Sequence, residues 1–382
     1  MLKRFTVKNF KNFKDSISID FENIAGYQFS TDCIVDGLIG KMLIYGRNAT
    51  GKTNLGKAIA DIRFTLFGGL VKTGSFLNVD SQEESAAFSY VFQFGDKELT
   101  YRYARYSERE MREEELLIDG QTIFRCDFFN EEYNFDNLKY IGAETANTER
   151  YLQNSLDEDD MEETLGPRLP FLRWLTSNVA FGNDSPVIRL SDYAEKMLFI
   201  TVGSVTAFRY RRINDRFFEA LENEGNLKGL EEFLNAMGVE CKLVLMKLPD
   251  GRKELYFAHE TKLLPFYESA SSGTLALVDL YRIILRAGSA SFLYLDEFDA
   301  FYHYEMAETV IQFFKKKYPG CQMIITTHNT NLMTNRLLRP DCLFILSRTG
   351  TLTALCNATM RELREGHNLE KMYISGEFEK YE

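Results

Sequence analysis

Hydrophobic and polar residues alternate along several stretches of the chain, as they do in half-buried β-strands. The alternation runs through residues 2–8 and 16–21, and it returns over residues 86–106 on both sides of Gly95-Asp96-Lys97. A glycine-containing turn between two alternating runs predicts a β-hairpin. Residues 241–258 repeat the pattern around a Pro-Asp-Gly turn, so they predict a second pair of strands.

Other stretches are mainly apolar or have the spacing of helices. Residues 42–45, 291–295 and 321–326 are apolar runs typical of strands. Residues 54–62 and most of 169–234 place apolar side chains at helical intervals. Strands mixed with helices predict an α/β fold, and 382 residues suffice for one large domain or for two to three ordinary ones.

The strand predicted at residues 42–45 leads into a phosphate-binding motif. Its sequence, Gly46-Arg47-Asn48-Ala49-Thr50-Gly51-Lys52-Thr53, matches G-x-x-x-x-G-K-[ST], and a predicted helix follows from Asn54. The glycines let backbone N–H groups face a phosphate, and the helix N-terminus attracts the same anion. We expect Lys52 to reach the β- and γ-phosphates of ATP and Thr53 to hold Mg²⁺.

Three later motifs have the chemistry of the second half of an ATP site. The strand at residues 291–295 ends in Asp296, placed for the Mg²⁺ shell, and Glu297, which can orient or deprotonate the attacking water. Upstream, small hydroxyl residues and a glycine open a predicted helix, which is either an anion site or a simple helix cap. These residues are Ser271, Ser272 and Gly273. Downstream, the third strand ends in His328, where open α/β sheets place ligand groups.

Charge and cysteine content limit the partners. The net charge of −11 gives no bulk attraction to nucleic acid, so a DNA or RNA site must be a local basic patch. The candidate patch is Arg209, Arg211 and Arg212, although these arginines could equally pair with neighbouring acids. The six cysteines form no C-x-x-C pair, which favours reduced thiols in a cytoplasmic protein. No apolar run reaches membrane-spanning length, so no membrane partner is expected.

Two charged runs are interpreted as solvent-exposed. Residues 107–115 mix acidic and basic side chains, which is typical of a solvated face. Residues 153–164 are acidic but lack a metal-ligand pattern such as D-x-D-x-D-G, so an exposed loop is expected.

The order of the motifs resembles the ABC-type ATPase heads of the SMC, RecF and OLD families. The resemblance covers residues 1–70 and 260–345. It implies a P-loop head with a mixed sheet and an antiparallel edge sheet, in which residues 1–150 form the N-terminal half and residues 241–382 the C-terminal half. Residues 151–240 would be an inserted, mainly helical lobe where SMC proteins have a long coiled coil.

The same resemblance implies a homodimer with two ATP molecules between the heads. Ser271 and Gly273 of one chain would face the γ-phosphate bound by Lys52 of the other, Asp299 would lie in the linking loop, and His328 would be the switch histidine. The signature reads Ala-Ser-Ser-Gly-Thr in place of Leu-Ser-Gly-Gly-Gln. The glutamine that senses Mg²⁺ in such heads is not identifiable, and the open candidates are Gln82 and Gln93.

A narrower resemblance joins residues 296–303, 327–332 and 362–371 to bacterial phage-defence and abortive-infection ATPases of the RloA/AbiLi type, with kin in PARIS- and Septu-like systems. It implies a sensor or scaffold, in a dimer or a higher assembly, that controls a separately encoded nuclease or toxin and meets a phage component or DNA. Because the sequence ends at Glu382, we expect no Toprim nuclease domain after the head. His303 and His367 are expected to be structural.

Two alternatives stay open at this point. One is a RecF-like repair ATPase in which ATP gates DNA binding. The other is a nucleotide-locked scaffold with negligible turnover.

Overall fold

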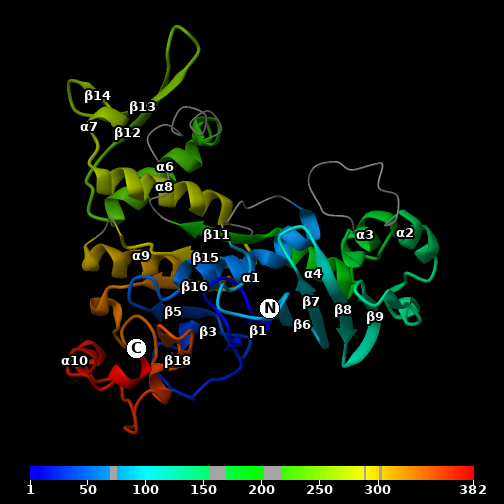
Figure 1. Ribbon diagram of the computed structural model, residues 1–382. Helices are drawn as coiled ribbons and strands as arrows, with labels where there is room; N and C mark the ends of the chain where they lie inside the picture. The colour runs from blue at the N-terminus through cyan, green and yellow to red at the C-terminus, as the bar shows by residue number, and fades with distance from the viewer. Residues whose placement is uncertain (69–74, 155–168, 202–216, 288–289, 301–302) are drawn as a thin grey trace.

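The computed structural model describes residues 1–68, 75–154, 169–201, 217–287, 290–300 and 303–382. Its centre is a six-stranded sheet of order β11-β15-β16-β5-β17-β18, in which only β18 runs antiparallel to its neighbour (Figure 1). The strands are β5 (Lys41–Tyr45), β11 (Met197–Thr201), β15 (Phe292–Asp296), β16 (Gln322–Thr327), β17 (Leu343–Leu346) and β18 (Leu352–Ala354).

A second, antiparallel sheet of seven strands has the order β10-β9-β8-β7-β6-β1-β2. It confirms the strands predicted at residues 2–8 and 16–21 and the hairpin predicted at 86–106. Its strands are β1 (Leu2–Lys8), β2 (Ile17–Asp20), β6 (Ala86–Phe94), β7 (Lys97–Arg105), β8 (Met111–Ile118), β9 (Gln121–Asp127) and β10 (Glu132–Asn134).

The prediction of a solvated face for residues 107–115 is wrong at Glu114, which is 1% exposed on β8. The charged residues on either side of Glu114 do point outward in alternation, so the run disguised a strand with one inward carboxylate.

Helix α1 (Lys52–Phe67) lies between the two sheets. Tyr294 of β15 donates a hydrogen bond of 2.5 Å to the Lys52 carbonyl, and Tyr90 of β6 donates one of 2.8 Å to the Ala58 carbonyl. Gly56 faces the central sheet so closely that a Cβ there would lie 2.5 Å from the Tyr294 ring. The helix that follows the phosphate motif is therefore fixed on both sides.

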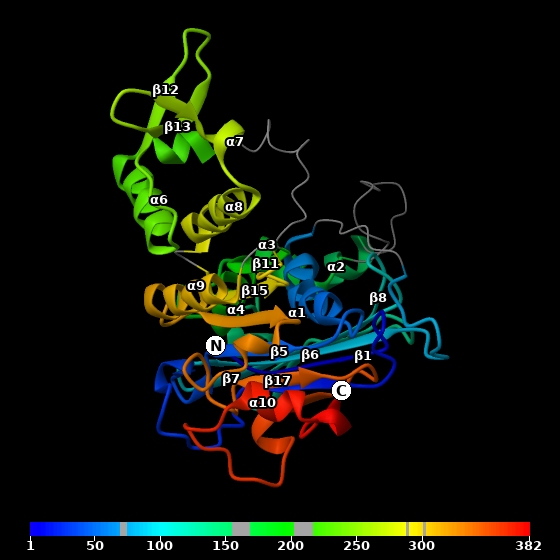
Figure 2. The same ribbon diagram turned by 90° about the vertical axis from the view of Figure 1, so that its left-hand side faces the viewer.

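The upper lobe in Figures 1 and 2 combines a three-stranded sheet with α6, α7 and α8. Its strands β12 (Leu243–Lys247) and β13 (Lys253–Ala258) confirm the pair predicted within residues 241–258, and β14 (Leu263–Pro265) completes the sheet. Its helices are α6 (Glu224–Ala236), α7 (Phe266–Ser269) and α8 (Ser272–Ala287).

The remaining elements cover the two sheets. They are the helices α2 (Thr148–Asn154), α3 (Phe171–Asn178), α4 (Pro186–Glu195), α9 (Tyr304–Lys317) and α10 (Leu369–Ile374), the hairpin β3 (Ile34–Val35) and β4 (Leu38–Ile39), and the 3-10 turns η1 (Thr31–Cys33), η2 (Leu138–Ile141), η4 (Thr330–Leu332), η5 (Leu355–Asn357) and η6 (Glu379–Tyr381).

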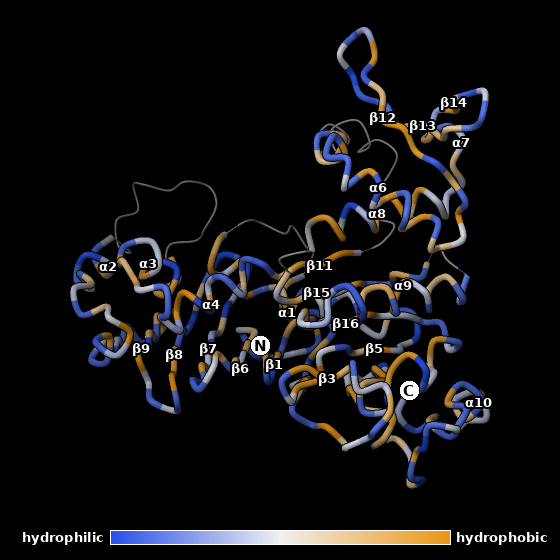
Figure 3. Tube along the Cα trace, turned by 180° about the vertical axis from the view of Figure 1, so that it is seen from behind, coloured by the Kyte–Doolittle hydropathy of each residue, from blue (hydrophilic) through white to orange (hydrophobic). Residues whose placement is uncertain are grey.

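The central strands are buried on both faces, as expected for parallel strands with helices on their faces. Every residue of β5, β15, β16 and β17 is buried, and Figure 3 shows hydrophobic colour along β5 and β11 while the outer loops are mostly hydrophilic. None of the helices in the described ranges has the length and apolar character needed to cross a membrane.

The predicted α/β fold class is confirmed. A P-loop strand lies in a mixed sheet beside an antiparallel sheet, and no described helix exceeds the 16 residues of α1 and α8, so the described ranges contain no long coiled coil. The division at residues 150 and 240 stays a prediction. Within the middle range, β11 is a strand of the central sheet, paired with β15.

Candidate functional site

The phosphate-binding motif forms a tight loop between β5 and α1. Ala49 and Gly51 have φ angles of 65° and 103°, the left-handed region that glycine adopts most easily. A Cβ on Gly46 would lie 2.6 Å from Thr50 Oγ1, which donates a hydrogen bond of 3.0 Å to the Arg47 carbonyl. The motif therefore needs its glycines for both loop conformation and close packing.

Lys52 points back into this loop. Its Nζ donates to the carbonyls of Gly46 (2.7 Å) and Arg47 (3.1 Å) and lies 3.6 Å from Glu297 Oε1. The side chain is 3% exposed, and this burial lowers its pKa, against the attraction of Glu297 and Asp296. A buried ammonium at the centre of the loop suits the oxygens of a phosphate chain.

Asp296 closes the site from the end of β15. Its two carboxylate oxygens accept hydrogen bonds from Thr53 Oγ1 (2.7 Å) and Thr326 Oγ1 (2.9 Å). Burial raises the pKa of Asp296, and the two hydroxyl donors oppose that rise. One strand, β16, lies between β5 and β15, so the sheet order brings the two distant motifs together.

The donors around Thr53 fit Mg²⁺. A hydroxyl and one carboxylate are hard oxygen ligands, and Mg²⁺ in nucleotide sites takes one or two carboxylates together with phosphate oxygens and waters. No cluster of three or more His, Cys, Asp or Glu that could hold a metal occurs in the described ranges, so a dedicated all-protein metal cage is not found there.

Glu297 has a constrained backbone. Its φ angle of 46° is uncommon for a non-glycine residue, and its N–H donates a hydrogen bond of 2.9 Å to Thr326 Oγ1. Residues in this region cost about 1–3 kcal/mol and are held by surrounding structure. The side chain is 39% exposed and reaches toward Lys52. The predicted role of Glu297 in activating water stays a prediction.

Asp299 and His328 are neighbours next to this pair. Thr327 Oγ1 donates a hydrogen bond of 2.7 Å to Asp299 Oδ2. Burial raises the pKa of Asp299, while the hydrogen bond from Thr327 and the charge of His328 act in the opposite direction. Asp299 is buried, whereas His328 is exposed at the end of β16. The predicted linking-loop and switch roles stay predictions.

The predicted signature lies on the upper lobe. Ser271 Oγ accepts a hydrogen bond of 3.1 Å from Thr274 N and lies 2.9 Å from Thr274 Oγ1, so it caps the start of α8. Ser271 and Ser272 are exposed, and α7, which directly precedes them, lies away from α1 in Figures 1 and 2. The roles of Ser271, Ser272 and Gly273 in facing a nucleotide bound by another chain stay predictions.

Sequence reasoning missed Asn12 as part of the site. Its Nδ2 donates a hydrogen bond of 3.2 Å to the Thr50 carbonyl, and its Oδ1 accepts one of 2.7 Å from Asn54 Nδ2. A Cβ on Gly51 would lie 2.2 Å from Asn12 Nδ2. In the sequence, Asn12 lies in the stretch between the strands predicted at residues 2–8 and 16–21, where no motif marks it.

The C-terminal segment also reaches the phosphate loop. Glu382 forms an ion pair with Arg47, and Tyr373 of α10 packs edge-on against Tyr45 at the end of β5, with ring centroids 4.7 Å apart. Asn335 holds this segment through hydrogen bonds of 3.0–3.2 Å to the carbonyls of residues 364, 365 and 367. No sequence pattern linked this segment to Arg47.

Several other residues named from the sequence lie away from this site or outside the described ranges. Arg209, Arg211 and Arg212 lie outside the described residues, as do residues 155–164 of the acidic run. Gln93 lies at the β6–β7 turn, where its Nε2 donates to the Gly95 carbonyl, so it is not placed at the site. Gln82 is exposed, and its role is not tested.

His303 is the N-cap residue of α9 and makes no side-chain capping hydrogen bond, and His367 Nδ1 accepts a hydrogen bond of 3.1 Å from Arg364 N. The structural roles predicted for these two histidines stay predictions.

These features define an ATPase-type P-loop domain, with a phosphate loop, a buried lysine and a strand-end acidic pair in one site. The model of the family described as AAA domain, putative AbiEii toxin, Type IV TA system, matches residues 41–334. The chain belongs to this family. No protein of curated function matches the sequence.

Among solved structures, the chain is similar to heads of SMC proteins. An SMC head bound to the C-winged helix domain of ScpA is 16% identical, with a TM-score of 0.48 over 92% of this chain and 96% of that one. The SMC head domain from Thermotoga maritima is 16% identical, with a TM-score of 0.43 over 92% and 98%. The SMC head of Pyrococcus furiosus with an extended coiled coil is 16% identical, with a TM-score of 0.44 over 99% of each chain.

Proposed function

We propose that this protein binds and hydrolyses MgATP. The observation that supports this is the convergence of Lys52 and Thr53 with Asp296 and Glu297, which are more than 240 positions apart in the sequence. Lys52 would exchange its carbonyl partners for β- and γ-phosphate oxygens. Thr53 and Asp296 would hold Mg²⁺, which supplies neutralisation of phosphate charge. Glu297 would orient the attacking water and accept its proton.

ATP would join two heads. Lys52 is buried in one loop, whereas Ser271 is exposed on the upper lobe, so the signature is free to face the loop of a second chain. In this arrangement Ser271 and Gly273 contact the γ-phosphate bound by the other protomer, with Asp299 and His328 near the same interface. A higher assembly would be built from such dimers, each joined by the same ATP contacts.

The biological role that we propose is a sensor or scaffold in bacterial antiphage defence. The family description names a toxin of a toxin–antitoxin system, and the segment at residues 362–371 resembles abortive-infection ATPases. In this role the cytoplasmic ATPase controls a separately encoded nuclease or toxin, with a phage component or DNA as the trigger.

Two variants test the nucleotide chemistry. Lys52→Ala should weaken MgATP binding at least about a hundredfold, because it removes the charged donor at the loop centre. Glu297→Gln should retain binding but lose turnover, and light scattering should then find a dimer with MgATP. Lys228→Ala and Glu305→Gln, on the exposed faces of α6 and α9, are the matched controls.

A monomeric Glu297→Gln variant in saturating MgATP would contradict the dimer. Wild-type turnover no faster than that of Glu297→Gln would instead indicate a nucleotide-locked scaffold. For the defence role, the plating efficiency of phage on cells that express the full gene neighbourhood should rise when Lys52→Ala replaces the wild type, and unchanged plating would contradict it.

A further inference from the structure

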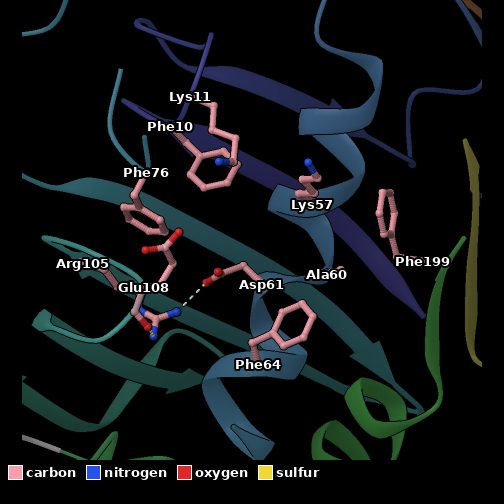
Figure 4. A pocket seen from close by; sticks show the side chains of 10 residues that line it. All are labelled: Phe10, Lys11, Lys57, Ala60, Asp61, Phe64, Phe76, Arg105, Glu108 and Phe199. Atoms are coloured by element: carbon pink, nitrogen blue, oxygen red, sulfur yellow. Dashed lines mark hydrogen bonds and ion pairs between the residues drawn. The ribbon is translucent and has the colours of Figure 1, made fainter. Parts of the chain in front are cut away.

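The phosphate loop has two cationic side chains, and they are held differently. Lys52 is buried and donates hydrogen bonds to two carbonyls of the loop. Arg47 is 55% exposed, and its guanidinium forms an ion pair with Glu382. Lys57, the next cation along the chain, instead lines a small cavity beside α1 (Figure 4). Arg47 is therefore the second cation of the loop itself, and its partner in this structure is a carboxylate.

Arg47 begins close to the place where phosphate is expected. Its carbonyl accepts hydrogen bonds from Lys52 Nζ (3.1 Å) and from Thr50 Oγ1 (3.0 Å). The backbone of Arg47 thus lies beside the ammonium that is expected to meet the β- and γ-phosphates. A guanidinium is a planar fork of donors that suits phosphate oxygens as well as carboxylate oxygens. The same side chain can therefore serve either Glu382 or a nucleotide.

Glu382 is held in a way that lets it come and go. Its side chain is 14% exposed, its carbonyl accepts a hydrogen bond of 3.2 Å from Arg348 N, and its own N–H donates one of 3.2 Å to the Glu379 carbonyl. The turn η6 is anchored at its start by Phe378, which is fully buried. Only the residues after Phe378 have to move to release Arg47, so the core stays intact.

The balance of charge favours the exchange once nucleotide is in the loop. An ion pair with an exposed partner contributes little to stability, because water solvates both charges well. A triphosphate offers several anionic oxygens beside Lys52, whereas Glu382 offers one carboxylate. The displaced carboxylate also regains its hydration, so the exchange costs little.

We propose that Arg47 is a second phosphate-binding side chain, which Glu382 holds until a nucleoside triphosphate displaces the carboxylate. The inference rests on the proposed function, because it requires the loop to bind MgATP. Coupling between two equilibria is reciprocal. Nucleotide therefore loosens residues 379–382, and loss of the Glu382 contact strengthens nucleotide binding.

Titration calorimetry with Mg²⁺ and the β,γ-imido analogue of ATP measures binding without turnover. Glu382→Gln should bind the analogue about threefold more tightly than the wild type, which is the scale of an exposed ion pair. Arg47→Gln should bind it about tenfold more weakly, because a charge-assisted contact is lost. Glu379→Gln, which neutralises an exposed acid of the same turn, is the matched control and should bind as the wild type does.

The double variant separates displacement from a general effect of charge. When Arg47 is glutamine, Glu382 has no guanidinium to hold, so adding Glu382→Gln should not change the affinity further. An equal gain from Glu382→Gln in both backgrounds would overturn the competition, and unchanged affinity in Arg47→Gln would overturn the phosphate contact. Either result leaves the proposed function intact, whereas a folded wild type that fails to bind the analogue would contradict the proposed function itself.

Hydrogen exchange at the Arg348 amide reports the displacement directly, because this N–H donates to the Glu382 carbonyl. Exchange there should become about threefold faster when the wild type is saturated with the analogue. Arg47→Gln should show the faster exchange without nucleotide, and Lys52→Ala, which should not bind the analogue, should keep the slower one in its presence. Unchanged exchange in the saturated wild type would overturn the displacement of Glu382.

Discussion

At the scale of single residues, one hydroxyl links both acidic groups of the site. Thr326 Oγ1 donates to Asp296 Oδ1 and accepts from the N–H of Glu297. All three groups are buried or partly buried, so each bond is costly to lose. Thr326 therefore positions Asp296 and Glu297 without needing to touch nucleotide itself.

We predict that Thr326→Val retains MgATP binding and slows hydrolysis by about ten- to hundredfold, or roughly 1.4 to 2.7 kcal/mol in the barrier. The valine leaves an oxygen of Asp296 unpaired and frees the strained backbone of Glu297. Thr326→Ser keeps the hydroxyl and should hydrolyse ATP nearly as the wild type does. A steady-state phosphate-release assay at saturating MgATP measures both, and equal rates for Val and Ser would contradict this role.

The sequence predicted those site residues that belong to motifs with given residue types at fixed intervals. Lys52, Thr53, Asp296 and Glu297 were found in this way, and they lie together. Thr326 and Asn12 were not found, because their contacts depend on which strands are neighbours and on how a turn folds over the phosphate loop. A single sequence holds no local signal for either.

At the scale of elements, a buried carboxylate fastens helix α3 to the antiparallel sheet. Glu114 of β8 accepts hydrogen bonds from the N–H groups of Phe171 (2.5 Å) and Leu172 (3.0 Å) and from Tyr101 OH (2.8 Å). Phe171 and Leu172 are the first residues of α3, where N–H groups lack partners within the helix. Burial nevertheless raises the pKa of Glu114 to about 7.

This shift predicts a pH-dependent stability. Because the folded pKa lies above the unfolded value of 4.5, the folded state holds the proton more tightly, and the stabilisation is full below pH 4.5 and lost as pH rises to about 7. The unfolding free energy of the wild type should fall by about 3 kcal/mol more than that of Glu114→Gln over this range. Urea titrations at pH 4.5 and 7.5 measure the difference, and parallel pH profiles for the two proteins would argue against it.

Strands were predicted correctly where apolar and polar residues alternate regularly. The hairpin of β6 and β7 alternates over nine residues on each strand, and both strands were predicted. Strand β8 was missed because charges fill both its outward positions and the inward position of Glu114. The buried carboxylate is satisfied by N–H donors at the start of α3, which lie more than fifty residues away in the sequence.

At the scale of the whole molecule, the proposed dimer requires each site to use two chains. Lys52 of one protomer and Ser271 of the other would meet at one nucleotide, so the two defects should complement each other. Lys52→Ala and Ser271→Arg are each expected to abolish turnover alone.

Mixed in equal amounts with MgATP, these two inactive proteins should recover roughly a quarter of wild-type activity, since half of the dimers are mixed and each has one intact site. The phosphate-release assay measures the recovery. Mixing Lys52→Ala with Thr53→Ala, two defects on the same side of the site, is the control that should recover none. Failure of the first mixture to recover activity would show that one chain supplies the whole site.

The overall arrangement was only partly predictable. The two sheets follow from alternating and continuous apolar runs, but the order of strands follows from no local pattern. That β11 joins the central sheet was not foreseen, because residues 197–201 sit in a range whose surroundings have helical spacing.

The position of β16 has a consequence for how the protein is made. On the ribosome, the phosphate loop and the acidic pair are both synthesised before residues 322–327, yet these residues form the strand that spaces them. A nascent chain that stops short of that strand contains both motifs but lacks the strand between β5 and β15, and with it the Thr326 hydroxyl that is bonded to Asp296. We therefore expect a growing polypeptide to gain its full affinity for nucleotide only after translation has passed about residue 327.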